Sequence, residues 1–318
     1  MTDAAIATVS PELAAQDGLA VQDDWRDWIA LTKPRVMSLV VFTGLIGLLV
    51  APGHINPVLG FADILAIAMG SGAAGAINMW YDRDIDVLMR RTANRPIPRG
   101  RIDGTDALGF GIVLSCAAIG LIGLAANWFA AGVLAFSILF YVGIYTMWLK
   151  RRTPMNIVIG GAAGAFPPII GWAAVTGSLG LLPLLMFAIT FVWTPPHFWS
   201  LALYAETDYE RAGVPMLPNV SGQRATRRQI LIYAIALLPV SLLPTILGVA
   251  GKTYGAVALL LGLGFIGYAV AVYRDQADAS GASAHNNRPA RQAFRYSLAY
   301  LAVLYLAFAV DAWIKTGR

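Results

Sequence analysis

The chain has little charge: 13% of its 318 residues are Asp, Glu, Lys or Arg, and 58% are hydrophobic. Soluble globular domains carry about 25% charged residues, roughly twice this share. Several apolar runs reach about 18 residues, which is enough to cross a hydrocarbon core of roughly 30 Å. The composition therefore excludes an ordinary soluble domain and predicts an all-α, polytopic integral membrane protein.

Cysteine is nearly absent, because Cys116 is the one cysteine in the chain. A single thiol excludes a disulfide within the chain and a multi-cysteine metal site, and its apolar surroundings favour a small core residue. The first 30 or so residues are acidic and lack the basic and apolar segments of a cleaved signal peptide. We expect residues 1–30 to form a disordered tail that leads into an interfacial segment at 25–31. Residues 31–318 are expected to form a single transmembrane domain.

The apolar runs predict nine transmembrane helices, at residues 36–52, 61–80, 107–126, 128–148, 156–175, 180–203, 229–250, 254–273 and 295–314. Of the 23 basic residues, all but Lys252, Lys315 and Arg318 precede the first helix or fall in the four long polar connectors and at their ends. Cytoplasmic loops carry an excess of Lys and Arg, so we expect a cytoplasmic N-terminus and an external C-terminus.

A weak internal repeat relates the two halves of the chain. An acidic stretch at 82–86 follows the second span, and another at 206–210 follows the sixth. Since four spans separate them, the halves are parallel and both acidic stretches are expected at one end of the bundle. The pairs Pro167–Pro168 and Pro195–Pro196 should kink their helices, which frees backbone groups inside the membrane.

The acidic stretch after the second span has a regular pattern, in which Asn78, Asp82 and Asp86 recur every four residues. On a helix this spacing places the three side chains on one face over roughly 12 Å. Two neighbouring carboxylates repel each other, and an oxygen-only cluster suits Mg²⁺, which commonly bridges to substrate phosphates. The alternative is a solvated helix end whose acids pair with Arg83 or Arg90.

Basic residues surround this motif on the same predicted face, which favours a Mg²⁺–diphosphate ligand. The candidate diphosphate ligands are Arg83, Arg90, Arg91, Arg95, Lys150 and Arg152. Arg-rich cytoplasmic loops also arise from topology and from attraction to anionic lipids, so this alternative stays open.

A diphosphate site that opens onto lipid suggests a lipid diphosphate. If its allylic chain ionises, the carbocation needs a water-poor cavity with aromatic faces. Aromatic residues that could line it are Trp80, Tyr81, Tyr141, Tyr145, Trp148, Trp193, Trp199 and Tyr204. Most of them are equally explained as packing or membrane-interface residues.

His197, in the string WTPPHFW, is the one histidine inside a predicted span. A lone histidine in a membrane helix is often a satisfied hydrogen bond between helices. Beside a double proline, however, it is expected where the helix is broken and a cavity forms. An imidazole there could ligate a haem iron, donate a hydrogen bond to a propionate or transfer a proton.

The motif N-x₃-D-x₃-D after the second of nine helices resembles the first motif of the UbiA superfamily of intramembrane prenyltransferases. Longer strings are similar to one family within it, the haem O synthases, over roughly residues 30–315. These strings are LTKPRV (31–36), NMWYDRDIDVLMRRTANRPIPRGRI (78–102), LKRRTPMNIVIGGAAGAFPPIIGWAAVTG (149–177), WTPPHFWSLALY (193–204) and DYERAGVPMLPNVSG (208–222). TPPHFW and PMLP are the narrower matches, because the first motif is common to the superfamily.

The resemblance implies a UbiA-like bundle that transfers a farnesyl group from farnesyl diphosphate to a vinyl group of haem B, with addition of water. It implies Mg²⁺ at Asn78, Asp82, Asp86 and Asp208, with His197 on the haem side. It also implies a bacterial inner membrane enzyme whose active site faces the cytoplasm. Its product would serve terminal oxidases, with haem A synthase or oxidase assembly proteins downstream and no nucleic acid involved.

The chain departs from the superfamily at the second motif, where Ala212 stands four residues after Asp208. Glu206 or Glu210 could substitute, so the number of metal ions stays open. Competing functions are a UbiA enzyme with an aromatic acceptor, a membrane transporter, and an assembly factor that holds haem. The histidine in TPPHFW argues against the first, and the acids at helix ends beside arginines argue against the second. A protein that merely holds haem has no need of the two aspartates.

Overall fold

The protein is described here from a computed structural model, which covers residues 24–316. The predicted disorder of residues 1–23 lies outside the described residues. The described part is helical and contains no β-strand. Its elements are α1 (Trp25–Leu31), α2 (Pro34–Leu49), α3 (Pro57–Tyr81), α4 (Arg83–Asp86), α5 (Gly104–Ala125), α6 (Trp128–Leu139), the π-helix η1 (Phe140–Leu149), α7 (Asn156–Ala165), α8 (Pro167–Thr176), α9 (Leu181–Tyr204), α10 (Glu206–Arg211), α11 (Leu217–Ile246), α12 (Lys252–Arg274) and α13 (Arg288–Thr316).

Eight helical stretches of the described chain are long and apolar enough to cross a membrane. Two of these stretches are composite, because α6 continues into η1 and α7 continues into α8. A ninth span forms if α1 and α2, which meet at a bend of 55°, are taken together. The nine-helix prediction is thereby confirmed, and the predicted segment at 25–31 is helix α1.

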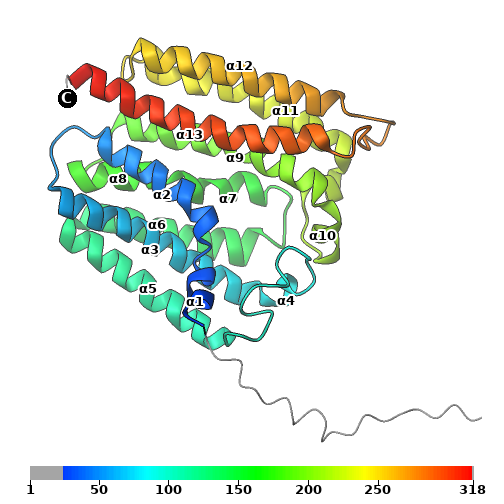
Figure 1. The fold of residues 1–318 in the computed structure, drawn as a ribbon, viewed down its shortest axis with the longest axis horizontal. Helices are drawn as coiled ribbons and strands as arrows, with labels where there is room; N and C mark the ends of the chain where they lie inside the picture. The colour runs from blue at the N-terminus through cyan, green and yellow to red at the C-terminus, as the bar shows by residue number, and fades with distance from the viewer. Residues whose placement is uncertain (1–23, 317–318) are drawn as a thin grey trace, which may run out of the picture.

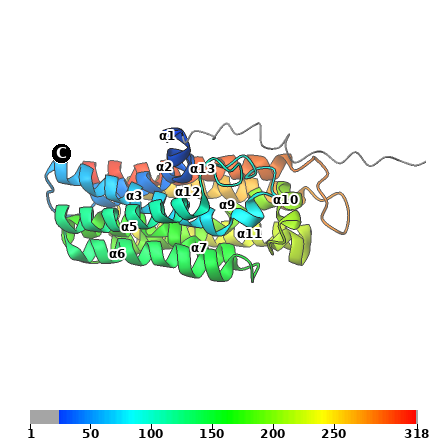
Figure 2. The same cartoon turned by 90° about the horizontal axis from the view of Figure 1, so that it is seen from below.

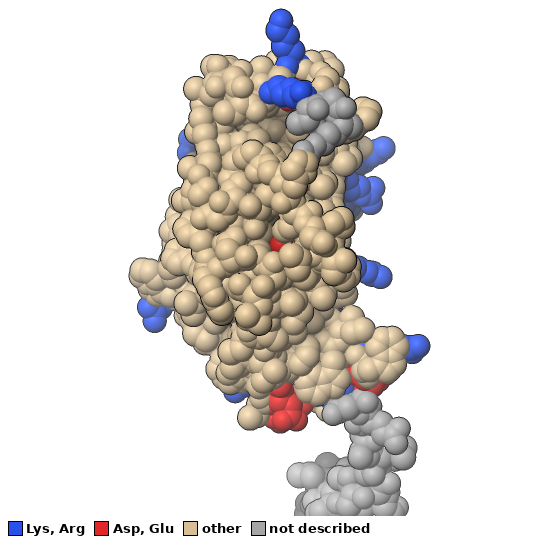
Figure 3. Space-filling view, turned by 90° about the vertical axis from the view of Figure 1, so that its left-hand side faces the viewer, with Lys and Arg blue, Asp and Glu red and all other residues tan. Residues whose placement is uncertain are grey.

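The long helices run nearly parallel, and their polar connectors gather at one end of the bundle (Figures 1 and 2). We call this the polar end; it holds residues 82–103, 150–155, 205–216 and 275–287. The α4 and α10 segments both lie there, as the parallel repeat predicts. The C-terminus lies at the opposite end, which presents mostly uncharged surface in Figure 3.

Close helix contacts hold the amino-terminal half against the rest of the bundle. A Cβ added to Gly171 of α8 would lie 2.1 Å from the carbonyl oxygen of Gly44 in α2. A Cβ on Gly160 of α7 would lie 2.1 Å from the ring of Tyr145 in η1. Small residues at these points let the backbones approach, as is common between membrane helices.

The two proline pairs differ, and one other expectation at a single position is wrong. Pro167 starts a new helix, as predicted for a kink, whereas α9 continues as one helix through Pro195 and Pro196. Hydroxyls near this point bind carbonyl oxygens of the previous turn, with Thr194 Oγ1 donating to Thr190 and Ser200 Oγ to Pro196. Cys116 is exposed rather than buried in the core, because it lies on the outward face of α5.

Candidate active site

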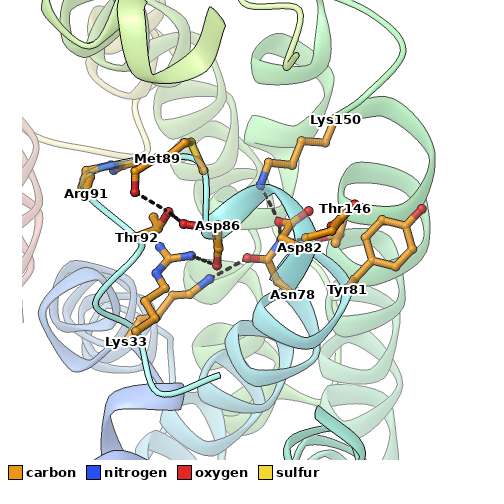
Figure 4. A network of polar contacts seen from close by, with 12 residues as sticks. Lys33, Asn78, Tyr81, Asp82, Asp86, Met89, Arg91, Thr92, Thr146 and Lys150 are labelled. Atoms are coloured by element: carbon orange, nitrogen blue, oxygen red, sulfur yellow. Dashed lines mark hydrogen bonds and ion pairs between the residues drawn. The ribbon is translucent and has the colours of Figure 1, made fainter. Parts of the chain in front are cut away.

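The predicted acidic motif forms one buried cluster where α3 ends (Figure 4). Asn78 lies in the last turn of α3, Asp82 is the residue that follows α3, and Asp86 ends α4. Asn78 is 3% exposed and both aspartates are fully buried. Asn78 Nδ2 donates to Asp82 Oδ2 at 2.7 Å and to Thr146 Oγ1 of η1 at 3.1 Å. The four-residue spacing therefore places the side chains together, as predicted.

Cations from three separate segments contact this cluster. Lys33, between α1 and α2, donates to Asn78 Oδ1 at 2.6 Å. Lys150, just after η1, pairs with Asp82 Oδ2, and Arg95 pairs with Asp86 Oδ2 at 2.6 Å. Arg151 lies 3.5 Å from Asp82 Oδ1 and binds Asp84 more closely, at 2.6 Å. These hydrogen bonds lower the pKa of the Asp84 carboxyl, which is itself exposed.

Each buried aspartate keeps one oxygen without a hydrogen-bond partner. These are Asp82 Oδ1 and Asp86 Oδ1. A buried carboxylate oxygen without a donor is costly, and a hard cation satisfies it. No three His, Cys, Asp or Glu side chains converge anywhere in residues 24–316. The site thus offers two carboxylates and an amide, which suits Mg²⁺ that takes its other ligands from water and phosphate.

The remaining candidates lie at the polar end but do not join this cluster. Arg83 turns back to the end of α3, donating to the carbonyl of Trp80 at 2.9 Å and lying over its ring. Arg90 and Arg152 are exposed, and no side-chain contact is found for either in the described structure. Asp208 of α10 is half-buried and has no side-chain partner there either. The structure therefore assembles Asn78, Asp82, Asp86, Arg95 and Lys150, and leaves Arg83, Arg90, Arg152 and Asp208 apart from them.

The two acidic stretches of the repeat are nonetheless in contact. Arg91 Nη2 donates to the hydroxyl of Tyr209 at 3.3 Å, and its guanidinium lies 5.9 Å from the centre of that ring. Beneath this contact, Ile85 and Met89 pack with Tyr209, Val214 and Met216 in one apolar cluster. The packing of α4 against α10 brings the first motif beside the segment that carries Asp208. In Figure 4, Arg91 lies on the opposite side of Asp86 from Lys150.

Tyr141 and Tyr145, two of the eight candidate aromatic residues, form a ring pair on η1 with centres 5.3 Å apart, and Thr146 of the same helix contacts Asn78. Others have different roles: Trp148 is 55% exposed, and Trp199 is buried against Tyr233. Trp80 and Tyr81 stack with arginines at the polar end. Trp193 and Tyr204 belong to a second group, around His197.

His197 lies buried between α9 and α13. Its ring is stacked between those of Trp193, at 4.3 Å, and Phe294, at 4.6 Å. Nδ1 lies 2.7 Å from Ser297 Oγ, and that hydroxyl donates to the carbonyl of Phe294. Because the hydroxyl proton is engaged there, Ser297 Oγ accepts from Nδ1–H and Nε2 keeps its lone pair. The break expected in the helix beside His197 is wrong, because α9 is continuous there, but Nε2 remains a possible metal ligand.

Lys33, Thr146 and Arg151 are site residues that were not predicted from the sequence. Lys33 has φ = 53° and ψ = 54°, a left-handed conformation that is rare in a residue other than glycine. Such strain is often found at functional sites, and here it accompanies the contact with Asn78. The sequence did contain signals, since LTKPRV and LKRRTP lie in the strings used for the resemblance. Neither string by itself, however, indicates that its lysine side chain points at the acidic motif.

The fold and this site together define an intramembrane prenyltransferase. Residues 40–299 match the UbiA prenyltransferase family, so the chain belongs to that family. Among curated proteins, it is 62% identical to a protein of Granulibacter bethesdensis over 91% of each chain. It is 61% identical to one of Gluconacetobacter diazotrophicus over 97% of this chain and 98% of the other. Both relatives are named protoheme IX farnesyltransferase.

Solved structures support the fold. A structure of digeranylgeranylglyceryl phosphate synthase superposes with a TM-score of 0.73 at 18% identity, covering 91% of this chain and 98% of the other. A UbiA homologue from Archaeoglobus fulgidus, bound to DMAPP and Mg²⁺, gives a TM-score of 0.70 at 13% identity over 90% and 98%. At these identities the likeness establishes the UbiA-like bundle.

Proposed function

We propose that this protein transfers a farnesyl group from farnesyl diphosphate to a vinyl group of haem B and adds water, giving haem O. The observation that carries this proposal is the pair of buried carboxylates, each with an oxygen that lacks a hydrogen-bond partner, among cations at one end of an apolar bundle. Such a pair suits the diphosphate half of the reaction. The name of the curated relatives supports both the farnesyl donor and the haem acceptor.

The Mg²⁺ ligands in this proposal are Asn78, Asp82 and Asp86, and Asp208 adds an oxygen from α10. When bound, Mg²⁺ neutralises diphosphate charge and makes the diphosphate a better leaving group. The buried oxygens without partners support this assignment, because they are the atoms that a hard cation would satisfy. The contact of α4 with α10 supports the role of Asp208.

The cations of the site hold the diphosphate. Lys150 and Arg95 pair with the two buried aspartates, and Arg90, Arg91 and Arg152 lie at the same polar end, whereas Arg83 is bound to Trp80. When the C1–O bond of farnesyl diphosphate breaks, both bonding electrons leave with the diphosphate. Fixed ammonium and guanidinium groups stabilise that developing charge. Tyr141 and Tyr145 offer their ring faces to the allylic cation.

The acceptor approaches from the His197 side. The terminal carbon of the vinyl group forms a bond to C1 of the farnesyl cation, which leaves a cation on the vinyl carbon attached to the porphyrin. Water adds to that carbon and releases one proton to solvent, giving the hydroxyethylfarnesyl side chain. Nε2 of His197, with its lone pair free, ligates the haem iron and fixes the porphyrin.

The location of the protein follows from its charge distribution. The enzyme lies in the inner membrane of a bacterium with its polar end in the cytoplasm, as the positive-inside rule favours. Farnesyl diphosphate and haem B would reach it from that side. Its product passes to haem A synthase or to proteins that assemble terminal oxidases.

The direct test is a reaction with the detergent-purified protein, haem B, farnesyl diphosphate and Mg²⁺, followed by mass spectrometry of the extracted haem. We expect a haem heavier by one farnesyl group plus water, and none without Mg²⁺. Unmodified haem, alongside farnesylation of an aromatic acid by the same preparation, would instead assign the aromatic acceptor common in the wider superfamily.

A further inference from the structure

A second group of arginines lies at the polar end and has no role in the diphosphate site. Arg288, Arg291 and Arg295 occupy the first turns of α13, and all three are exposed. No carboxylate pairs with them within residues 24–316. Asp275, in the preceding connector, is already bound to Arg227 at 3.5 Å and to His285 at 2.8 Å. This part of the surface therefore carries uncompensated positive charge.

These arginines lie above the aromatic group that contains His197. The guanidinium of Arg291 lies 5.4 Å from the centre of the Tyr204 ring, and Tyr204 meets Phe294 edge to face at 6.3 Å. Phe294 in turn stacks on His197. Arg291, Phe294 and Arg295 are three and four residues apart, so they lie on adjoining parts of one helix face. An aromatic column thus runs from the arginines to the imidazole.

The column has the depth of a flat, amphipathic ligand. His197 precedes Tyr204 by seven residues of α9, so it lies about 10 Å further from the polar end. Arg291 precedes Ser297, the partner of His197, by six residues of the antiparallel α13. A flat ligand with a metal at its centre and anionic groups along one edge would therefore place the metal at Nε2 of His197. Its anionic groups would then lie near the guanidiniums of Arg291 and Arg295.

We propose that Arg291 and Arg295 bind the two propionate carboxylates of the haem substrate. This inference rests on the proposed function, because it concerns the same acceptor. With its carboxylates at the polar end, the porphyrin directs its uncharged vinyl edge toward the membrane interior. Arg91, which donates to Tyr209 in the α10 segment that follows Tyr204, links this region to the diphosphate site. The vinyl group and C1 of the farnesyl chain then approach each other below the charged groups.

The test compares haem B with its dimethyl ester, which keeps the iron, the porphyrin and both vinyl groups but lacks the two negative charges. Dissociation constants are measured by absorbance titration in neutral lipid nanodiscs. We expect the wild type to bind haem B about tenfold more tightly than the dimethyl ester. This ratio corresponds to the lower part of the range for charge-assisted hydrogen bonds, because both arginines are exposed. In the Arg291→Gln/Arg295→Gln variant this preference should fall close to one.

Two control variants sharpen the result. Arg228→Gln removes an exposed arginine of α11 at the same end and should keep the wild-type preference. Arg291→Lys/Arg295→Lys keeps the charge and should restore much of it. A preference that survives in the double glutamine variant overturns the proposal. In that case, nanodiscs of phosphatidylglycerol test for anionic lipid instead. If they change the activity of the wild type but not that of the variant, these arginines bind anionic lipid.

Failure of the proposed function would look different. The wild type in the same nanodiscs is assayed for farnesylation by mass spectrometry. If it forms no farnesylated haem but shows the arginine-dependent preference for haem B, the propionate site stands and the reaction is wrong. If it turns over normally and the preference does not depend on Arg291 and Arg295, the reaction stands and the propionate site is wrong.

Discussion

At the scale of single residues, the site is a balance between buried acids and cations that come from distant parts of the chain. Asp82 and Asp86 are fully buried, and Lys150 and Arg95 compensate their charge. Breaking one half of a buried pair leaves an uncompensated charge, which is costly. If a diphosphate draws these cations away, replacement charge must reach the aspartates, which is the role proposed here for Mg²⁺.

The first prediction concerns the Asp82 carboxylate. Asp82→Asn should lower farnesylation of haem at least roughly 100-fold, because it removes a metal ligand and the partner of Lys150. Turnover is measured by mass spectrometry, with membrane insertion checked by the amount of purified protein. Asp84→Asn is the matched control, because Asp84 is exposed and its ion pair with Arg151 contributes little. Wild-type turnover in a well-expressed Asp82→Asn protein would contradict the assigned role.

The second prediction concerns His197. His197→Ala should remove the absorbance change that accompanies axial ligation of haem and should weaken haem binding. Ser297→Ala should weaken it less, because the imidazole stays in place while its tautomer is no longer fixed. Titrations with haem B followed in the Soret region measure both effects. If the His197→Ala variant keeps the wild-type spectrum but loses turnover, the imidazole orients the substrate or transfers a proton instead.

The sequence predicted the site where its parts are local and failed where they are distant. Asn78, Asp82 and Asp86 lie within two helical turns, so their spacing alone places them together. The partner of Asn78 is Lys33, 45 residues earlier, and no periodicity connects the two positions. Arg83 was predicted as a ligand because it lies inside the motif. It points away because residues one apart on a helix face different directions.

At the scale of elements, the site depends on close packing of α7 against η1, because η1 carries Thr146, Tyr141 and Tyr145. The backbone of α7 can approach η1 because position 160 has no side chain. Overpacking such a contact forces backbone shifts. The geometry of the aromatic pair is thus set by a glycine on the neighbouring helix.

The third prediction follows from this packing. Gly160→Ala should destabilise the protein by about 1–3 kcal/mol and lower turnover, because the new Cβ would lie 2.1 Å from the ring of Tyr145. Gly164→Ala, one turn along the same helix, meets nothing within 4 Å and should be neutral or slightly stabilising. Thermal unfolding in detergent measures both. Equal stability of the two variants would mean that η1 moves aside without cost.

Element positions were predicted well because hydropathy reports directly on membrane crossing. Helices must satisfy their own backbone hydrogen bonds in lipid, so long apolar runs have one available structure. The effect of proline is less local. At Pro167 the preceding helix ends, whereas α9 continues through Pro195 and Pro196. Nearby hydroxyls donate hydrogen bonds to carbonyl oxygens of α9. Likewise, the neighbours of Cys116 in sequence could not reveal that it faces outward, because α5 is apolar on all sides.

At the scale of the whole molecule, function depends on a difference between the two ends of the bundle. The polar end holds the acidic cluster, the arginines of α13 and the long connectors, and the other end presents mostly uncharged surface (Figure 3). Two water-soluble head groups, a diphosphate and a pair of propionates, can therefore enter from one side of the membrane while their apolar parts meet inside it. The two substrates need no route across the bilayer, provided that the polar end faces the compartment that supplies them.

The fourth prediction tests that orientation. With Cys116 replaced by Ala, a cysteine at exposed Ala279 in the α12–α13 connector should react with a membrane-impermeant maleimide only in inverted vesicles. A cysteine at exposed Ser178, in the α8–α9 connector at the other end, should react in intact cells. The reason is that basic connectors are retained in the cytoplasm, and Ala279 lies between Arg274 and Arg288. The reverse labelling pattern would place both head-group sites outside the cell, where neither the supply of farnesyl diphosphate nor the function proposed here could be sustained.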